Sequence, residues 1–194
     1  HRGLIISLNQ FIFSLMFYFN PVALYNGFLS FGYSTIFTCL PSISVLLDRD
    51  IAQENVLKFP TLYKILLKGR ELNFKNFLFW FFKSLVQSGI IMFGAMFVFR
   101  DNLFLKIVTV TFTALIYLEI LNVYMEINKF HWFMLVALAL TTVVYTLTLF
   151  FFDYYLDVYY VFKIDIFYKI IIIAIVAWLP FFIASRVKKF LFPQ

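Results

Sequence analysis

The sequence has little charge and few of the residues that form metal or disulfide sites. Only 13% of its 194 residues are charged and 63% are hydrophobic, whereas a soluble domain is about 25% charged and about 45–50% apolar. The single cysteine, Cys39, excludes an internal disulfide framework and a Cys-based zinc site. Two histidines, His1 and His131, are too few for the histidine clusters of membrane di-iron enzymes. The mean hydropathy of +0.92 excludes a water-soluble domain standing alone.

What the chain does have is long apolar runs, each followed by a polar or charged break. A membrane-spanning helix needs about 20 apolar residues, and the runs are too long and too continuous for barrel strands. The sequence therefore predicts an all-α membrane protein, one domain over residues 1–194 built as a bundle of six transmembrane helices. The predicted helices cover about 3–19, 25–47, 76–99, 103–125, 132–152 and 166–185.

The basic residues are distributed unequally between the two sides of such a bundle. Eleven Lys and Arg fall on the side of the long 48–75 loop, and four fall on the other side. Because cytosolic loops carry the excess of Lys and Arg, this bias predicts that the 48–75 loop and both chain ends are cytosolic. Lys83 lies within a helix and is expected to extend towards the membrane surface. The chain begins with His and is expected to be a piece of a longer protein.

We find no catalytic or metal-ligating constellation: the sequence lacks a phosphate-binding G-x-x-x-x-G-K-[ST] loop and a G-x-S-x-G nucleophile motif. Polar groups inside apolar runs are more informative, because burying them in a membrane is costly. Glu119 is the acidic residue deepest in a run. Two interpretations stay open for it: an ion or headgroup contact, and a hydrogen bond to a neighbouring helix.

The second run is the most polar and contains a proline. Ser34, Thr38 and Pro41 lie along it, and Pro41 removes one helical hydrogen bond and frees a carbonyl about one turn earlier. Broken helices line the substrate path in many transporters, although a kink can also be tolerated for packing alone. Composition and periodicity thus indicate a polytopic membrane domain with one polar helix that Pro41 interrupts.

Ordered motifs connect the chain to a known family. Residues 32–41, Gly-Tyr-Ser-Thr-Ile-Phe-Thr-Cys-Leu-Pro, resemble the sixth transmembrane helix of the type IV P-type ATPases, the phospholipid flippases. Asp48-Arg-Asp-Ile51 resembles the acidic D-Q-D-[VI] element, with Arg in place of Gln. Residues 59–64 resemble the [YF]-P-x-L-Y-[KR] loop, residues 68–80 the K-G-R entry to the seventh helix, and residues 87–90 its Q-[SG]-G-I segment. In this order and at these spacings the motifs make the resemblance strong together, and it implies that nearly the whole chain corresponds to helices five to ten of the family.

The resemblance implies roles for a few residues. Arg2 stands where the family has a lysine in helix five near the lipid path, and Ser34 stands where many members have asparagine. Pro41 matches the family proline, and Thr38 belongs to the same motif. These four are the candidates for the lipid path. Glu119 matches an acidic position in helix eight of one branch, and is a structural or ion-contact candidate.

The resemblance also implies a function for the longer protein: an Mg-dependent ATPase that moves phospholipid from the lumenal or exoplasmic leaflet to the cytosolic one. The D-K-T-G-T phosphorylation motif and the other ATP-hydrolysing motifs are absent from this sequence, so no cofactor and no catalytic residue is expected in this chain. The expected partners are phospholipid and the rest of the pump, with no nucleic acid. Residues 1–7 look most like the branch that works without an accessory subunit, and the expected location is the Golgi, endosome or plasma membrane. The alternative is a non-enzymatic membrane scaffold or passive channel.

Overall fold

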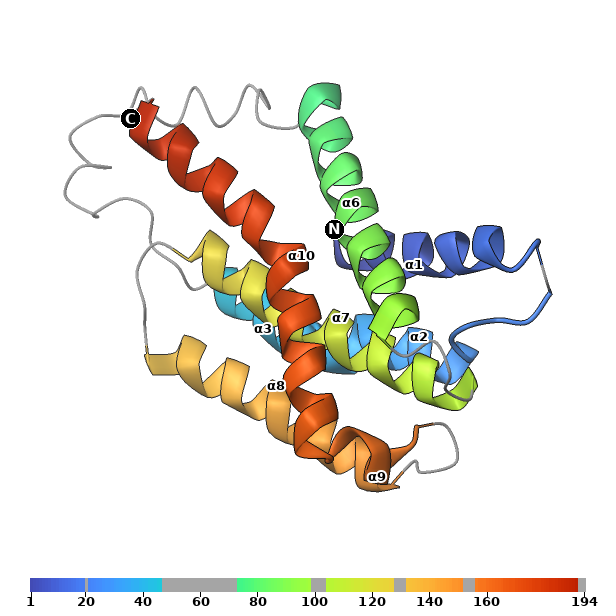
Figure 1. Ribbon diagram of the computed structural model, residues 1–194. Helices are drawn as coiled ribbons and strands as arrows, with labels where there is room; N and C mark the ends of the chain where they lie inside the picture. Colours follow the sequence, from blue (N-terminus) through green and yellow to red (C-terminus); the bar gives the residue numbers. More distant parts are fainter. Residues whose placement is uncertain (20, 47–72, 99–103, 128–131, 152–155, 192–194) are drawn as a thin grey trace.

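The computed structural model describes the chain except for residues 20, 47–72, 99–103, 128–131, 152–155 and 192–194. All the regular secondary structure of the described part is helical (Figure 1). Its elements are α1 (Arg2–Met16), α2 (Gly27–Gly32), the π-helix η1 (Tyr33–Phe37), α3 (Cys39–Leu46), α6 (Phe74–Val98), α7 (Phe104–Glu126), α8 (Trp132–Phe151), α9 (Val158–Val161) and α10 (Ile164–Leu191).

Five helices are long and apolar enough to cross a membrane: 27–45, α6, α7, α8 and α10 as far as residue 187. Their hydrophobic residues cover nearly all faces, which is the pattern of helices that meet either other helices or lipid. These five confirm the predicted all-α membrane fold, and the start of α6 lies within two residues of the predicted one.

The first predicted span differs from the structure. Helix α1 has 15 residues and ends at Met16, three residues before the predicted end. At about 1.5 Å per residue it is about 22 Å long, which is less than the hydrocarbon thickness of a bilayer. It ends there because Tyr18 and Phe19 take positive φ values of 52° and 57°, and the amide of Phe19 turns back to the carbonyl of Ser14 at 2.7 Å.

Helix α7 is the centre of the bundle. In the most apolar stretch of α7, 67% of the residues are buried, compared with 22% in the most apolar stretch of α8. Helix α10 packs against both α7 and α6, α1 packs against α6, and α3 packs against α8 and α7. The ring of Phe112 in α7 lies within about 6 Å of the rings of Tyr25, Tyr33, Phe37 and Tyr145. This aromatic cluster holds the second segment, 27–46, against the central helix.

The helices alternate in direction. The last turns of α3, α7 and α10 lie on one side of the bundle, and α9 lies on the other (Figure 1). The first turns of α6 lie on the same side as the last turns of α7 and α10, because Asn76 lines a cavity together with Met125 of α7 and Ser185 of α10. Which of the two sides is cytosolic stays a prediction from the Lys and Arg distribution.

Candidate functional site

The candidate membrane span 27–45 is interrupted at the junction between η1 and α3. The amide of Thr38 bonds to the carbonyl of Tyr33 at 3.1 Å, a spacing of five residues, and its hydroxyl donates to the same carbonyl at 2.7 Å. A π-turn of this kind inserts one residue into a helix and is frequent at functional sites. Helix α3 then begins at Cys39. The interruption predicted from Pro41 is present.

Pro41 lies in the first turn of α3 and is buried. A proline is tolerated there, because the amides of the first turn have no partner within their own helix. It nevertheless supplies no amide to the carbonyl of Phe37, one turn earlier. The break and the proline therefore act together: η1 widens the helix before the junction, and Pro41 prevents a regular helix from continuing through it.

The side chain of Arg2 reaches this junction from α1. Its Nη1 donates to the carbonyl of Thr38 at 3.1 Å and to the hydroxyl of Ser42 at 3.2 Å. The Ser42 hydroxyl and amide also bond to the Thr38 carbonyl, at 2.7 and 3.2 Å. One carbonyl at the break thus accepts three donors, and one of them carries a full positive charge.

Of the four lipid-path candidates, the structure brings Arg2, Thr38 and Pro41 together. Ser34 lies in η1, one turn before them, half-buried, and its hydroxyl donates to the carbonyls of Ser30 and Phe31 in its own helix. Those bonds satisfy the hydroxyl locally. The acidic and loop motifs at 48–51, 59–64 and 68–70 lie outside the described residues.

Glu119 lies in a second polar region, between α1, α6 and α7. It is 6% exposed, and its Oε2 lies 3.5 Å from Nδ1 of His1. The other ring nitrogen of His1 lies 3.1 Å from Oε1 of Gln87. Gln87 in turn forms a reciprocal pair of amide hydrogen bonds with Asn122, at 3.1 and 3.3 Å. Glu119 therefore lies against the start of α1, within 3.5 Å of the His1 ring.

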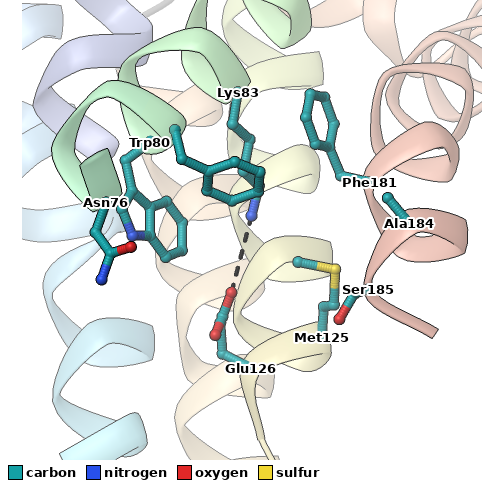
Figure 2. A pocket seen from close by; sticks show the side chains of 9 residues that line it. Asn76, Trp80, Lys83, Met125, Glu126, Phe181, Ala184 and Ser185 are labelled. Atoms are coloured by element: carbon teal, nitrogen blue, oxygen red, sulfur yellow. Dashed lines mark ion pairs between the residues drawn. The ribbon is translucent and has the colours of Figure 1, made fainter. Parts of the chain in front are cut away.

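A third feature is a cavity of about 550 Å³ between α6, α7 and α10. Figure 2 shows that Lys83 points across it towards Glu126. The Lys83 ammonium lies 3.8 Å from Glu126 and 4.6 Å from the centre of the Trp80 ring. Phe181 and Ser185 of α10 form the opposite wall. A buried cation, a carboxylate and an aromatic face can together bind the phosphate and the ammonium of a zwitterionic group.

Lys83 was expected to extend towards the membrane surface. Its ammonium does point to the last residue of α7, but the side chain is only 1% exposed, because Trp80 and Glu126 cover it. Sequence reasoning also missed Gln87 and Asn122 as interacting residues. A usable signal was the spacing of four between Lys83 and Gln87, and of three and four along Glu119, Asn122 and Glu126.

Comparison with known proteins connects these features to one family. The family model described as phospholipid-translocating P-type ATPase C-terminal matches residues 1–194. The chain is 42% identical over 193 residues to a bovine protein described as probable phospholipid-transporting ATPase IIB, covering 100% of this chain and 17% of that protein.

Two further relatives come from other organisms. A Caenorhabditis elegans protein described as probable phospholipid-transporting ATPase tat-5 is 43% identical over 189 residues, 97% of this chain and 18% of that protein. The phospholipid-transporting ATPase NEO1 of Saccharomyces cerevisiae is 34% identical over 195 residues, 100% of this chain and 17% of that protein. The chain therefore spans less than a fifth of the length of these curated relatives.

Proposed function

The chain belongs to the family of phospholipid-translocating P-type ATPase C-terminal regions, and we propose that it forms part of the membrane domain of an ATP-driven lipid pump. The pump moves phospholipid from the lumenal or exoplasmic leaflet to the cytosolic leaflet. The names of the relatives support lipid transport. The direction follows from the resemblance in the motifs of residues 32–41 and 48–51.

The observation that supports this function best is the interrupted helix 27–46. Non-helical backbone at membrane depth is tolerated only beside protein or water, and here it coincides with a cation from another helix. A polar backbone with an adjacent guanidinium can replace the hydration that a lipid headgroup loses inside the membrane. The Thr38 carbonyl, the Ser42 hydroxyl and Arg2 supply such groups in one place.

In this mechanism the residues of the chain have separate tasks. Pro41 and η1 keep the helix open at Thr38, so that polar backbone is present at the junction. Arg2 holds that junction and provides positive charge close to the path of an anionic phosphate. Ser34 provides a neutral hydroxyl one turn earlier. Each of these interactions binds or orients lipid, and none of them breaks a covalent bond.

ATP and Mg²⁺ are assigned to the part of the pump outside this chain. None of the family's phosphorylation motifs occurs in residues 1–194, and the described residues contain no group of three or more His, Cys, Asp or Glu suited to a metal. We therefore propose no step of ATP hydrolysis on these residues. The pump works without an accessory subunit, as the resemblance of residues 1–7 suggests, in the Golgi, endosome or plasma membrane.

The chain offers a matched pair of prolines for testing this function. Pro41 is buried at the junction, whereas Pro180 lies inside α10 on an exposed face. In the longer ATPase, purified and placed in vesicles, we expect Pro41→Ala to reduce the translocation of a fluorescent phospholipid at least tenfold. The alanine supplies an amide that can bond to the Phe37 carbonyl, so that a regular helix can continue through the junction. Pro180→Ala should leave translocation within about twofold of wild type.

Two results would contradict the proposal. If the wild-type protein hydrolyses ATP but no phospholipid changes leaflet, the chain does not serve lipid transport. If it neither hydrolyses ATP nor moves lipid, the scaffold or passive channel is the better interpretation. Equal loss in both proline variants shows that proline affects folding and that the junction has no special part in transport.

A further inference from the structure

Charged and amide side chains form a stripe along the interface between α6 and α7. Lys83 and Gln87 are four residues apart in α6, and Glu119, Asn122 and Glu126 are spaced by three and four in α7, so each set shares one helix face. The Gln87–Asn122 hydrogen bonds and the Lys83–Glu126 ion pair join the two sets. The stripe begins at the cavity shown in Figure 2 and continues into the core of the bundle.

At the inner end of the stripe, the hydrogen-bonding groups of His1 require a proton. Oε1 of Gln87 can only accept, so Nε2 of His1, 3.1 Å away, carries a hydrogen. In a neutral imidazole the other nitrogen, Nδ1, then has only a lone pair. That nitrogen lies 3.5 Å from Oε2 of Glu119. Two acceptors therefore face each other unless one proton lies between them.

We propose that His1 and Glu119 form a proton-binding site inside the bundle, which water reaches from the cavity between α6, α7 and α10 along this stripe. The bound proton comes from a water chain and forms an N–H bond at Nδ1 of His1. The product is an imidazolium beside a carboxylate. On release the N–H bond breaks and the proton returns to water, so no other bond changes.

Charged and titratable groups from several elements surround Glu119. Arg2 of α1 and Lys83 of α6 are side-chain cations that act on this carboxylate. Tyr33 of η1 is the neighbouring phenol, and Glu126 lies two turns further along α7. Within the described part of the chain, Glu119 Oε2 and the Tyr33 hydroxyl have no hydrogen-bond partner. These two oxygens provide acceptors for the water that delivers the proton.

A purely structural role explains the stripe less well. Ion pairs in a bundle interior stabilise little, because the cost of removing charge from water offsets their attraction. Apolar side chains would pack α6 against α7 at lower cost, and ionisable residues at this depth mark ion or proton pathways. The stripe starts at residues that line the cavity, Lys83 and Glu126, so the proposed path of water to the buried pair follows polar side chains along its whole length.

The test measures protonation directly, in the longer ATPase that contains this chain. Infrared difference spectra of the purified protein in bilayers are recorded over roughly pH 5–8, the range in which histidine titrates. We expect one titrating imidazole signal in the wild type that is lost in Glu119→Gln, because the Gln amide can donate to Nδ1 in place of the proton. His1→Gln should lose the same signal. Asp157→Asn is the matched control.

Asp157 is a suitable control because it also loses one negative charge. Its backbone amide bonds to Thr109 and its side chain accepts the amide of Tyr160, which asparagine can also do. Thr109 is ten residues from Glu119, about 15 Å along α7. Wild-type titration in Glu119→Gln, or equal loss in Asp157→Asn, overturns the proposal. If Glu119→Gln does not fold, His1→Gln makes the same test.

A second measurement tests whether the proton site is coupled to transport. This coupling rests on the proposed function, whereas the proton site itself does not. In lipid-stimulated ATP hydrolysis, the dependence of kcat on pH should lose one ionisation in Glu119→Gln and keep it in Asp157→Asn. Absence of lipid stimulation in the wild type contradicts the proposed function, while the infrared titration still decides whether the proton site exists. An unchanged kcat profile in Glu119→Gln, together with a lost infrared signal, overturns the coupling of the proton to turnover.

Discussion

Replacement of Arg2 separates a contact that depends on geometry from one that depends on charge alone. Charge-assisted hydrogen bonds stabilise by about 1.5–3 kcal/mol each, and Arg2 forms two, to the Thr38 carbonyl and the Ser42 hydroxyl. The carbonyl keeps two donors from Ser42 after truncation, so no acceptor is left without a partner. We therefore assign about 2 kcal/mol to Arg2→Ala and, because an ammonium can keep one contact, about 1 kcal/mol to Arg2→Lys.

If the junction must hold this shape in the rate-limiting step, these energies convert directly into rates. A loss of about 1 kcal/mol slows a step roughly fivefold and about 2 kcal/mol roughly thirtyfold. The assay is lipid-stimulated ATP hydrolysis by the purified longer ATPase, with thermal unfolding measured alongside. Lys106→Ala is the control, since its ammonium lies over the Tyr160 ring, 4.7 Å from the ring centre and away from the junction.

The relative activities of Arg2→Lys and Arg2→Ala decide the interpretation. Full activity in Arg2→Lys with loss in Arg2→Ala shows that only positive charge is needed, and it refutes the geometric role. Full activity in both removes Arg2 from the lipid path. A changed headgroup preference in Arg2→Lys, at normal expression, shows direct contact with the lipid phosphate.

Three further outcomes follow from the structure. Replacing Gln87 and Asn122 by leucine, singly and together, should give a coupling energy of about 1 kcal/mol in unfolding measurements, because each single change leaves a buried amide without its partner; strict additivity contradicts the paired amides. Gly94→Leu should destabilise by about 1–3 kcal/mol in the same assay, since even a Cβ atom there lies 3.3 Å from α10, and wild-type stability contradicts that close approach. A cysteine at position 53 should react with a cytosolic probe and one at position 157 only with a probe on the opposite side, as the Lys and Arg bias requires; the reverse pattern refutes the orientation.

Much of the fold could be predicted because a bilayer imposes length and polarity on each helix. The predicted 76–99 run corresponds to α6, Phe74–Val98, and the predicted break near Pro41 is present. The π-turn before it could not be predicted. Its five-residue hydrogen bond depends on the hydroxyl of Thr38 and on the packing of Phe37 between Phe112 and Tyr145. Those rings come together only in the folded bundle.

The candidate site was predicted less completely than the fold. The predicted fourth helix ended at residue 125, which placed Glu126 in a loop, whereas α7 includes it. Glu119 and Glu126 lie on one helix face, two turns apart, only because α7 extends as far as Glu126. The partner of Glu119 is His1, 118 residues away in the chain, and periodicity within one helix contains no information about such a contact.

The first turn of α1 joins the two polar regions of the bundle. His1 contacts Gln87 and Glu119 on the side of α6 and α7, while the next residue, Arg2, contacts Thr38 and Ser42 at the junction. Adjacent residues thus bind two systems that share no other hydrogen bond or ion pair among those described here. A displacement of this turn lengthens contacts in both at once, and buried polar groups lose partners only at considerable cost. We therefore expect the shape of the junction and the protonation of the proposed His1–Glu119 site to be coupled through this one helical turn.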